Sequence, residues 1–303
     1  MADEPEHRVL ARWRRHVGDP VALDLAPPAP PGLRGFDVLC WNVAVGRGRV
    51  DALLERVRAG EDPARPLVLL LQEAYRADDT VPEEAPERGS AGGDLAPPRP
   101  LDVVELAREH GLSLRYAPSM RNGGSRSDRG NAVLATAALA GAHAFSLLYV
   151  RQRRVAVAAE LAGVPHLSLV SAHLDTHRRL FGGSSCAAQA ARLAEAVVRR
   201  DGPGGVILGG DFNTPLGERD PAFRALLRAG LSPPARRGRW SHTHHGPVRL
   251  LLDHLLLHVP DGRVESVELS RVDEDRGDRA PTVFGSDHHP LLARVSLRAG
   301  ASG

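Results

Sequence analysis

The chain has 303 residues, 42% of them hydrophobic, and carries a formal net charge of +2 with a pI of about 8.8. This length and apolar content suffice for a large buried core, and a fold of two packed sheets can remain one domain at this size. The small net charge neither requires nor excludes a polyanionic partner. Evidence for a nucleic-acid substrate must therefore come from the site itself.

The composition also bounds redox chemistry and location. Because the sequence contains no lysine, every fixed side-chain cation is arginine, which we attribute to genome composition rather than to a binding patch. Cys40 and Cys186 form neither a disulfide framework nor a C-x-x-C metal motif. The N-terminal residues 1–7 are acidic where a signal peptide would be basic and apolar, and no apolar stretch reaches the roughly 18 residues of a membrane span. We therefore expect a cytoplasmic protein without an integral membrane segment.

The first part of the chain predicts an appendage. Residues 8–17 have the pattern of a short amphipathic helix, with Leu10, Trp13 and Val17 on one side, and a proline-rich linker follows at residues 26–31. We assign residues 1–34 to an N-terminal appendage and linker, residues 35–298 to the main domain and residues 299–303 to a tail.

From Phe36 onward, apolar runs with strand character alternate irregularly with helical patterns. Helical periodicity covers residues 50–59, 101–110, 187–200 and 221–229. Several strand-like runs follow one another without a helix between them, at residues 131–136, 155–161 and 167–172. This mixed order predicts two sheets with helices outside them rather than one parallel sheet.

Residues 78–100 differ from their surroundings. The segment is acidic, rich in proline and glycine, and without periodicity, and it exceeds the roughly 12 to 15 residues of an ordinary loop. We interpret it as a flexible surface insertion. A functional loop is the alternative, because the segment begins only a few residues after Glu73.

Five apolar runs share one design, in which polar side chains follow the run or lie inside it. They are Asn42 after residues 36–41, Gln72 and Glu73 after 67–71, His173 and Asp175 after 167–172, Asp211 and Asn213 after 206–208, and Asp253 and His254 within 250–257. Ser286 to Pro290 precede a last apolar strand. Because strand ends converge at one edge of a sheet, we expect a single polar cleft.

These residue types suit the hydrolysis of a phosphate ester. Such a reaction needs a hard cation, donors for the non-bridging oxygens and a group that takes a proton from water. Asp, Glu and Asn supply the oxygen ligands that Mg²⁺ prefers, and His acts as a base near neutral pH. The candidate oxygen donors are Asn42, Glu73, Asp211, Asn213 and Asp287, and the candidate bases are His173 and His288.

Each pair of polar residues also has a simpler reading. Residues two apart on an extended chain face one side, so Asp211 and Asn213 can point into one cleft, and Gly209 and Gly210 would allow a tight bend before them. Taken alone, however, Asp211 and Asn213 suit a turn or a helix cap equally well.

Jointly and in this order, the motifs resemble those of the endonuclease/exonuclease/phosphatase superfamily. They are W-N at residues 41–42, L-Q-E at 71–73, G-N-A at 130–132, S-A-H-L at 171–174, G-D-F-N at 210–213, L-D-H at 252–254 and S-D-H-x-P at 286–290. Together they cover nearly everything from residue 36 to residue 295. The resemblance implies an α/β fold, namely a four-layer α/β/β/α sandwich of two mixed sheets flanked by helices, with the cleft at one end of the sheets.

The resemblance also implies a role for each matching residue. For the metal, it implies Mg²⁺, with Mn²⁺ able to substitute, held chiefly by Glu73 with Asn42 beside it and Asp287 at or next to the ion. For catalysis, it implies that Asp211 orients or deprotonates the attacking water and that Asp253 orients His288, the catalytic histidine. Asn213 would hold a phosphate oxygen, and His173 would lie against the phosphate or the leaving group.

Two further positions have two readings each. Family members often have a cleft-facing arginine at the position of Arg154, so this residue would contact the substrate phosphate or form a surface salt bridge. Asp175 lies where the family varies, and either shapes specificity or supports His173.

The chain also departs from the family pattern, because His254 stands where many members have tyrosine, a change that we expect to alter packing only. It lacks the tyrosine-proline-asparagine signature of abasic-site repair enzymes, which argues against that activity.

A histidine cluster raises a different chemistry. His242, His244 and His245 form an H-x-H-H run similar to the H-x-H-x-D-H motif of zinc hydrolases. Because the motif's aspartate is absent and no helical pattern follows, we interpret the cluster as a loop on the rim of the cleft.

The substrate is left open by the fold, because the family cleaves DNA, RNA, sphingomyelin, inositol phosphates and protein–DNA adducts. We expect a phosphodiester hydrolase acting on nucleic acid, since no aromatic or apolar stretch indicates membrane docking. The alternative is a phosphatase or phosphodiesterase of small-molecule or lipid head groups. An inactive binding protein is disfavoured because Glu73, Asp211 and His288 are all present.

Overall fold

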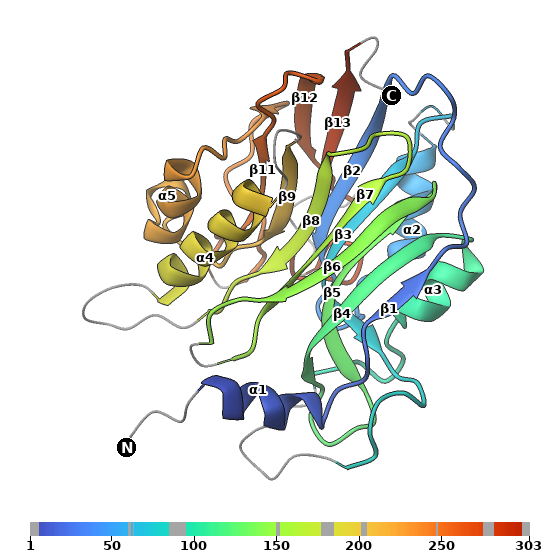
Figure 1. Cartoon of the computed structure of the whole chain (residues 1–303), viewed down its shortest axis with the longest axis vertical. Helices are drawn as coiled ribbons and strands as arrows, with labels where there is room; N and C mark the ends of the chain where they lie inside the picture. Colours follow the sequence, from blue (N-terminus) through green and yellow to red (C-terminus); the bar gives the residue numbers. More distant parts are fainter. Residues whose placement is uncertain are drawn as a thin grey trace.

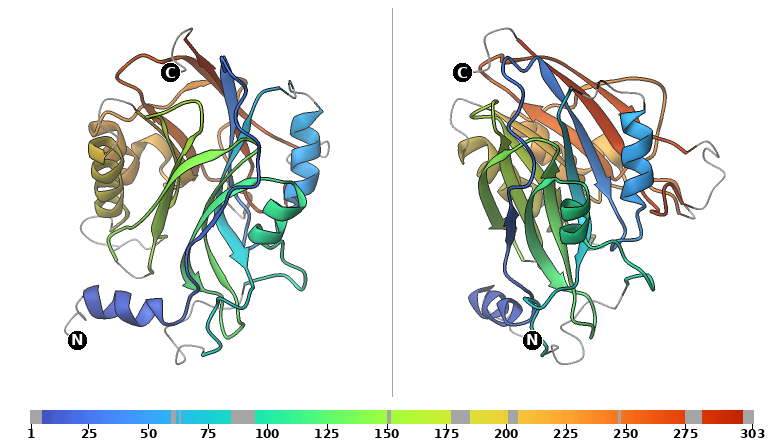
Figure 2. Two further views of the ribbon diagram at one scale, coloured as in Figure 1. Left: turned by 45° about the vertical axis from the view of Figure 1, so that its right-hand side comes forward. Right: turned by 90° about the vertical axis from the view of Figure 1, so that its right-hand side faces the viewer.

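Two mixed β-sheets pack face to face, and helices cover their outer surfaces (Figures 1 and 2). The computed structural model describes residues 6–59, 62, 64–84, 95–149, 152–176, 185–200, 205–246, 248–274 and 282–298. The larger sheet has the strand order β1-β4-β5-β3-β2-β13-β12-β10, and the smaller has the order β11-β9-β8-β7-β6. The predicted four-layer α/β/β/α sandwich is confirmed.

The centre of the larger sheet consists of strands that are buried along most of their length. Its strands are β1 (Val21–Leu23), β2 (Gly35–Asn42), β3 (Leu67–Arg76), β4 (Ser113–Arg121), β5 (Asp128–Ala135), β10 (Ala235–Arg236), β12 (Val264–Arg271) and β13 (Leu291–Leu297). β2 runs parallel to β3 and antiparallel to β13. Because helices cover one face and the second sheet the other, β2 and β3 have continuous apolar runs rather than alternation.

The smaller sheet also combines parallel and antiparallel strands. Its strands are β6 (Leu139–Ser146), β7 (Val155–Leu161), β8 (Ser168–His173), β9 (Val206–Asp211) and β11 (Asp253–His258). β8 and β9 are parallel, and β11 is antiparallel to β9. The apolar run at residues 250–257, predicted as one strand, is a strand only from Asp253 onward. Asp253 therefore lies at a strand end, like the other site residues.

The helices match the predicted periodic segments to within a few residues. They are α1 (Glu6–Arg14), α2 (Val50–Arg58), α3 (Val103–Glu109), α4 (Ser185–Arg200) and α5 (Pro221–Arg228), with a short 3₁₀ turn η1 (Gly217–Arg219). Asp102 and Asp220 cap the N-termini of α3 and α5 by accepting backbone N–H groups. α2 and α3 pack on the larger sheet and α4 and α5 on the smaller one, as the left view of Figure 2 shows.

The two sheets approach each other closely at Gly209, which changes the interpretation of the glycine pair. Gly209 and Gly210 lie within strand β9 rather than in a bend, so the predicted bend is wrong. A Cβ at Gly209 would lie 2.8 Å from Leu70 Cδ1, and one at Gly210 would lie 1.9 Å from the Ala172 carbonyl oxygen. Both positions therefore require glycine because neighbouring atoms occupy the space of a side chain.

The N-terminal segment joins the larger sheet. β1 pairs antiparallel with β4, with Val21 opposite Tyr116. The division at residue 34 stays a prediction, and the tail at 299–303 lies outside the described residues. Of the predicted insertion, residues 78–84 and 95–100 are described. Within the described part of the chain, no helix combines the length and apolar character needed to cross a bilayer.

Candidate active site

The ends of the central strands of both sheets meet at one pocket. In the larger sheet, Asn42 at the end of β2 lies in register with Gln72 of β3. In the smaller sheet, Asp211 at the end of β9 lies in register with His173 of β8 and with Asp253 of β11. Because parallel neighbours end at the same edge, these polar residues are brought together as the sequence pattern predicts.

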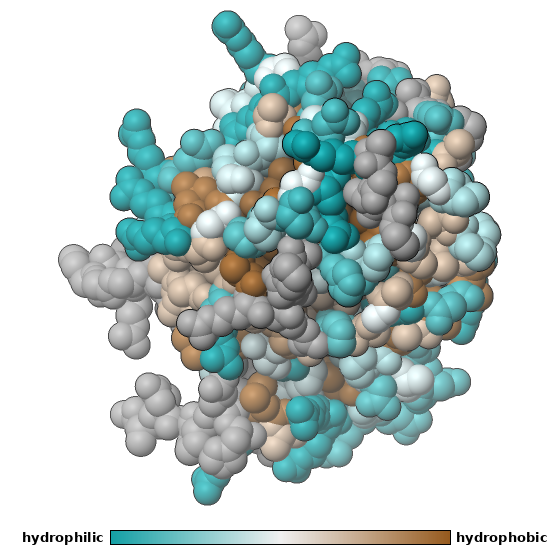
Figure 3. All heavy atoms as spheres, turned by 45° about the horizontal axis from the view of Figure 1, so that its top comes forward, coloured by the Kyte–Doolittle hydropathy of each residue, from teal (hydrophilic) through white to brown (hydrophobic). Residues whose placement is uncertain are grey.

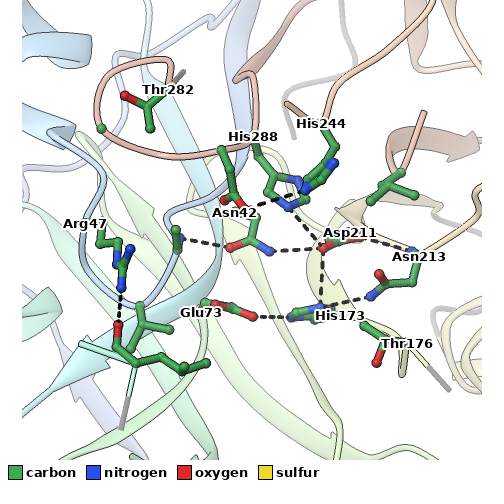
Figure 4. A pocket seen from close by; sticks show the side chains of 16 residues that line it. Asn42, Arg47, Glu73, His173, Thr176, Asp211, Asn213, His244, Thr282 and His288 are labelled. Carbon is green, nitrogen blue, oxygen red and sulfur yellow. Dashed lines mark hydrogen bonds and ion pairs between the residues drawn. The ribbon is translucent and has the colours of Figure 1, made fainter. Parts of the chain in front are cut away.

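The pocket has a volume of about 430 Å³ and contains most of the predicted site residues (Figure 4). Those that line it are Asn42, Glu73, His173, Asp211, Asn213, Asp287 and His288. Asp253 has no exposed surface and lies behind His288. The side chains therefore come from both sheets and from the loop before β13.

Glu73 is directed into the pocket by an irregularity in β3. The register of β3 against β5 shifts between Leu71 and Ala74, and Glu73 has a φ of 54°. This bulge interrupts the regular alternation of side chains along β3, so that the side chains of Gln72 and Glu73 lie in different environments. Gln72 is buried and donates from Nε2 to the Ser171 hydroxyl of the other sheet at 3.0 Å, whereas Glu73 lines the pocket. A strained backbone at a polar pocket residue is typical of a functional position.

Asp211 is the hub of the site. Its Oδ2 accepts from Asn42 Nδ2 at 3.0 Å, and its Oδ1 accepts from the backbone N–H of Asn213 at 3.0 Å. The same Oδ2 lies 3.4 Å from His173 Nε2 and 3.8 Å from His288 Nε2. Burial, together with the charge of Asp253, raises the pKa of Asp211 to about 6, although His288 and the two hydrogen bonds act in the opposite direction.

His288 is held by three contacts. Its Nδ1 lies 2.8 Å from Asp253 Oδ2, its backbone N–H donates to the Ser286 hydroxyl at 3.0 Å, and its carbonyl accepts from Trp41 Nε1 at 2.8 Å. Burial alone would lower its pKa, but the charges of Asp253 and Asp211 outweigh burial and raise it to about 10. His288 is therefore an imidazolium at neutral pH.

His173 has the opposite character. Burial, reinforced by the charges of Arg154 and His288, lowers the pKa of His173 well below its ordinary value. Asn213, which has a φ of 47°, donates from Nδ2 to the Leu174 carbonyl at 2.9 Å and lies 3.2 Å from His173 Nε2. The pocket thus contains one charged and one neutral histidine.

The oxygen donors predicted for the metal fit a hard cation. Glu73 is about one-quarter exposed, and its carboxylate accepts no hydrogen bond from any described residue, its nearest charged contact being His173 Nδ1 at 4.0 Å. Asn42 Oδ1 accepts from the backbone N–H of Ala44 at 3.0 Å and keeps a second lone pair, and Asp287 is about half exposed. A carboxylate that faces a pocket without a donor is suited to a cation ligand.

Arg154 and Asp175 lie beside the pocket rather than in its lining. Arg154 is buried and donates from Nη2 to Gln152 Oε1 at 2.9 Å, while Asp175 accepts from the backbone N–H of Gln152 at 3.1 Å. Neither lines the pocket among the described residues. The burial of Arg154 excludes the surface salt bridge that was the second reading of this residue. Contact between Arg154 and the substrate phosphate stays a prediction.

His254 lies away from the pocket. Its ring packs on Phe223 at a centroid distance of 4.5 Å and on Phe212 at 5.9 Å, and its Nε2 lies 2.7 Å from the Thr214 hydroxyl. Burial lowers its pKa to about 3, so it is a neutral packing residue. The substitution of tyrosine by histidine thus leaves Asp253 in place.

The lining also includes residues outside the set predicted for catalysis and metal binding. Arg47, Thr176, His244 and Thr282 all line the pocket. The His244 ring packs on His288 at a centroid distance of 4.8 Å, and its Nε2 lies 3.5 Å from Asp287 Oδ2. The H-x-H-H run placed this histidine on the rim correctly, but only the pairing of His244 with His288 selects which of its histidines faces the pocket.

A two-sheet sandwich with acids, amides and histidines around a strand-end pocket defines a phosphoesterase. A model of the Endonuclease/Exonuclease/phosphatase family matches residues 39–288, and the chain belongs to this family. Its members are hydrolases that act on phosphoesters. No curated protein matches the chain in sequence.

Solved structures with the same fold are distant in sequence. They include an endonuclease/exonuclease/phosphatase family protein from Leptotrichia buccalis, with 14% identity over 87% of this chain and 99% of that chain at a TM-score of 0.60. The catalytic domain of human nocturnin, with bound sulfate, has 16% identity over 92% of this chain and 98% of that chain, at a TM-score of 0.55. Sphingomyelinase C from Streptomyces griseocarneus has 17% identity over 86% of this chain and 99% of that chain, at a TM-score of 0.53. At these identities the likeness concerns the fold alone.

Proposed function

We propose that the protein is a Mg²⁺-dependent phosphodiesterase that uses water as the nucleophile. The observation that carries the proposal is the position of Asp211, whose Oδ2 lies within hydrogen-bond or ion-pair reach of Asn42, His173 and His288 in one pocket. This arrangement places a buried carboxylate between an imidazolium and an amide donor. The oxygens of Glu73, Asn42 and Asp287 would hold the cation, which supplies charge neutralisation at the phosphate.

The electrostatics divide the roles of the pocket residues. With a pKa of about 6, Asp211 is ionised at pH 7 to 8 and accepts a proton from the attacking water. His288, an imidazolium held by Asp253, stabilises negative charge that develops on the phosphate oxygens. Asn213 and neutral His173 orient the phosphate through hydrogen bonds. His288 thus serves as an electrostatic stabiliser rather than as the base.

We propose nucleic acid as the first substrate class. Hydrolysis of a small-molecule or lipid head-group phosphoester is the second candidate, and one observation favours it. Arg47 is the single arginine that lines the pocket among the described residues, whereas nucleic-acid grooves follow the phosphate backbone with several cations. On the face shown in Figure 3, hydrophobic residues form separate patches among hydrophilic ones, which does not favour docking on a bilayer.

A substrate panel tests the proposal. Purified protein with Mg²⁺ or Mn²⁺ is assayed on single- and double-stranded DNA, RNA, sphingomyelin, inositol phosphates and aryl phosphate mono- and diesters. An Asp211→Asn variant, which keeps the size of the side chain, is the control for contaminating hydrolases. We expect diesters to be cleaved and the variant to lose at least two orders of magnitude in rate. Absence of hydrolysis on the whole panel, or equal rates in both proteins, would contradict the proposal.

A further inference from the structure

Three histidines form a second cluster behind the active-site loops. His242 and His245 come from the segment before β11, and His289 follows the catalytic histidine in the loop before β13. One ring nitrogen from each lies within 4.8 Å of the other two. All three residues are buried, with exposed fractions of 5%, 8% and 0%. Bonds from imidazole nitrogen to zinc are about 2.0 to 2.1 Å long, so the three rings would move closer together to share one ion.

The backbone separates this cluster from the catalytic pocket. His244 pairs with His288 as an isolated bridge, and the neighbouring residues are joined by hydrogen bonds from His289 N–H to the Thr243 carbonyl at 2.7 Å and from His245 N–H to the Asp287 carbonyl at 2.6 Å. His244 and His288 line the pocket, whereas His245 and His289 stack on each other at a centroid distance of 4.4 Å and are not part of its lining.

Residues at the end of β12 complete the surroundings. Asp273 Oδ1 lies 2.7 Å from His289 Nδ1, which leaves Nε2 directed away from the carboxylate. A carboxylate on the remote nitrogen is the usual partner of a metal-binding histidine, because it fixes the ring and raises its basicity. Arg271 lies 3.2 Å from both His242 Nε2 and the His242 carbonyl, and 3.0 Å from Asp273 Oδ2. When the His242 imidazole binds an ion, Arg271 still donates to the His242 carbonyl and to Asp273 Oδ2.

We propose that His242, His245 and His289 bind Zn²⁺ or a similar transition-metal ion, with Asp273 orienting His289. Three imidazoles suit Zn²⁺ and its neighbours in the transition series, whereas Mg²⁺ requires oxygen ligands of the kind found around Glu73. The site differs from the zinc-hydrolase pattern because its third ligand comes from the catalytic loop rather than from the H-x-H-H run. The ion links the segment before β11 to the loop that carries His288 and thereby holds the catalytic imidazolium in place.

Metal binding is measured in a protein whose pocket is weakened as a metal site, and the His245→Asn variant distinguishes the histidine cluster from the pocket group of His244, Asp287 and His288. Metal-free Glu73→Gln protein, in which the pocket ligand is weakened, is titrated with Zn²⁺ by equilibrium dialysis and elemental analysis. We expect one equivalent to bind, and Zn²⁺ at a hundredfold excess over its Kd to raise the Tm by roughly 5 °C. His245→Asn should abolish both effects, and Asp273→Asn should weaken binding by about 10- to 100-fold. His258→Asn, at a partly exposed ring that contacts Gly230, is the matched control.

A spectroscopic measurement keeps the test independent of the stability of the variants. Co²⁺ added to the Glu73→Gln protein should produce the intense visible bands of a tetrahedral site, and Zn²⁺ should displace them while Mg²⁺ should not. If this protein retains no zinc above the buffer blank, or if His245→Asn binds it equally well, the cluster is a packed group of histidines and the proposal fails. Hydrolysis by the wild-type protein is assayed separately, so that either outcome leaves the proposed phosphodiesterase activity to be decided on its own.

Discussion

Nδ1 of His288 lies 2.8 Å from Oδ2 of Asp253, a carboxylate that has no exposed surface. The backbone N–H of Asp253 donates to the Thr243 hydroxyl at 3.0 Å, so the segment that carries the other histidines also holds this acid. A buried carboxylate is costly unless it is paired, and an imidazolium next to it satisfies both charges. The two residues should therefore act as one unit.

A double-mutant cycle tests this coupling. His288→Ala should lower kcat by roughly two to four orders of magnitude, the usual scale for a positioned proton-transfer or charge-stabilising group. Asp253→Asn should cost much less in the His288→Ala background than in the wild type, because residues that act as a unit are not additive. His258→Ala serves as the control for a histidine outside the site. Fully multiplicative losses in kcat would mean that the two residues act independently.

The pH dependence of kcat/KM should be bell-shaped. Asp211, with a pKa of about 6, must be ionised to accept a proton, so the rate rises as the pH increases through this value. His288, with a pKa of about 10, must be protonated to stabilise charge, so the rate falls as the pH increases through this value. A bound dication shifts the midpoint of the acidic limb further down, to a pH below about 6. A profile with its optimum below pH 5 would rule out these assignments.

Glu73→Gln should weaken the apparent affinity for Mg²⁺ without unfolding the protein. The substitution keeps the size of the side chain but removes the charge that attracts a hard cation. The Mg²⁺ concentration for half-maximal hydrolysis of an aryl phosphodiester should increase by at least tenfold. Glu109→Gln, at an exposed position of α3, is the matched control. An unchanged Mg²⁺ titration in the Glu73 variant would show that the metal ligand lies elsewhere.

The acidic residues that precede Leu95 in the sequence should disfavour long polyanions. Leu95, the first described residue after position 84, lines the pocket, and its carbonyl accepts from Arg47 Nη2 at 3.0 Å. Residues 83–94 contain four acidic residues and one arginine, and a neutral glycine-serine linker of equal length removes this excess. The ratio of DNA to aryl diester hydrolysis should then rise severalfold at low salt and less at 0.15 M salt, where charges are screened beyond about 8 Å. A ratio that does not change at low salt would mean that the charge of the segment does not influence the choice of substrate.

Gly209→Ala should destabilise the contact between the sheets. The added methyl group would lie 2.8 Å from Leu70 Cδ1 and 3.0 Å from Cys40 Sγ, in a layer with no free space. Overpacking of this kind typically costs about 1 to 3 kcal/mol. Gly124→Ala, where no atom lies within 4 Å, is the control. Denaturant unfolding of both variants measures the difference, and equal free energies of unfolding would show that the sheets adapt to the methyl group.

Local patterns in the sequence were sufficient to predict two sheets with helices outside them and most of the acids, amides and histidines that line the pocket. Continuous apolar runs mark strands that are buried on both faces, and polar residues at their ends must collect at one edge, because parallel strands share a direction. Helical periodicity located α2, α3, α4 and α5 to within a few residues, since each buries one face against a sheet.

Only the tertiary structure decided relationships that depend on other strands. The bulge that separates Gln72 from Glu73 exists because β3 must pair with β5 while its carboxylate faces the pocket, and neither constraint is visible within the L-Q-E motif. The space around Gly209 is set by Leu70 and Cys40 of the opposite sheet, so the glycine was mistaken for a bend. Likewise, His289 joins His242 and His245 because two distant segments pair across His244 and His288. Contacts between residues far apart in the chain arise from packing, and a single sequence does not specify them locally.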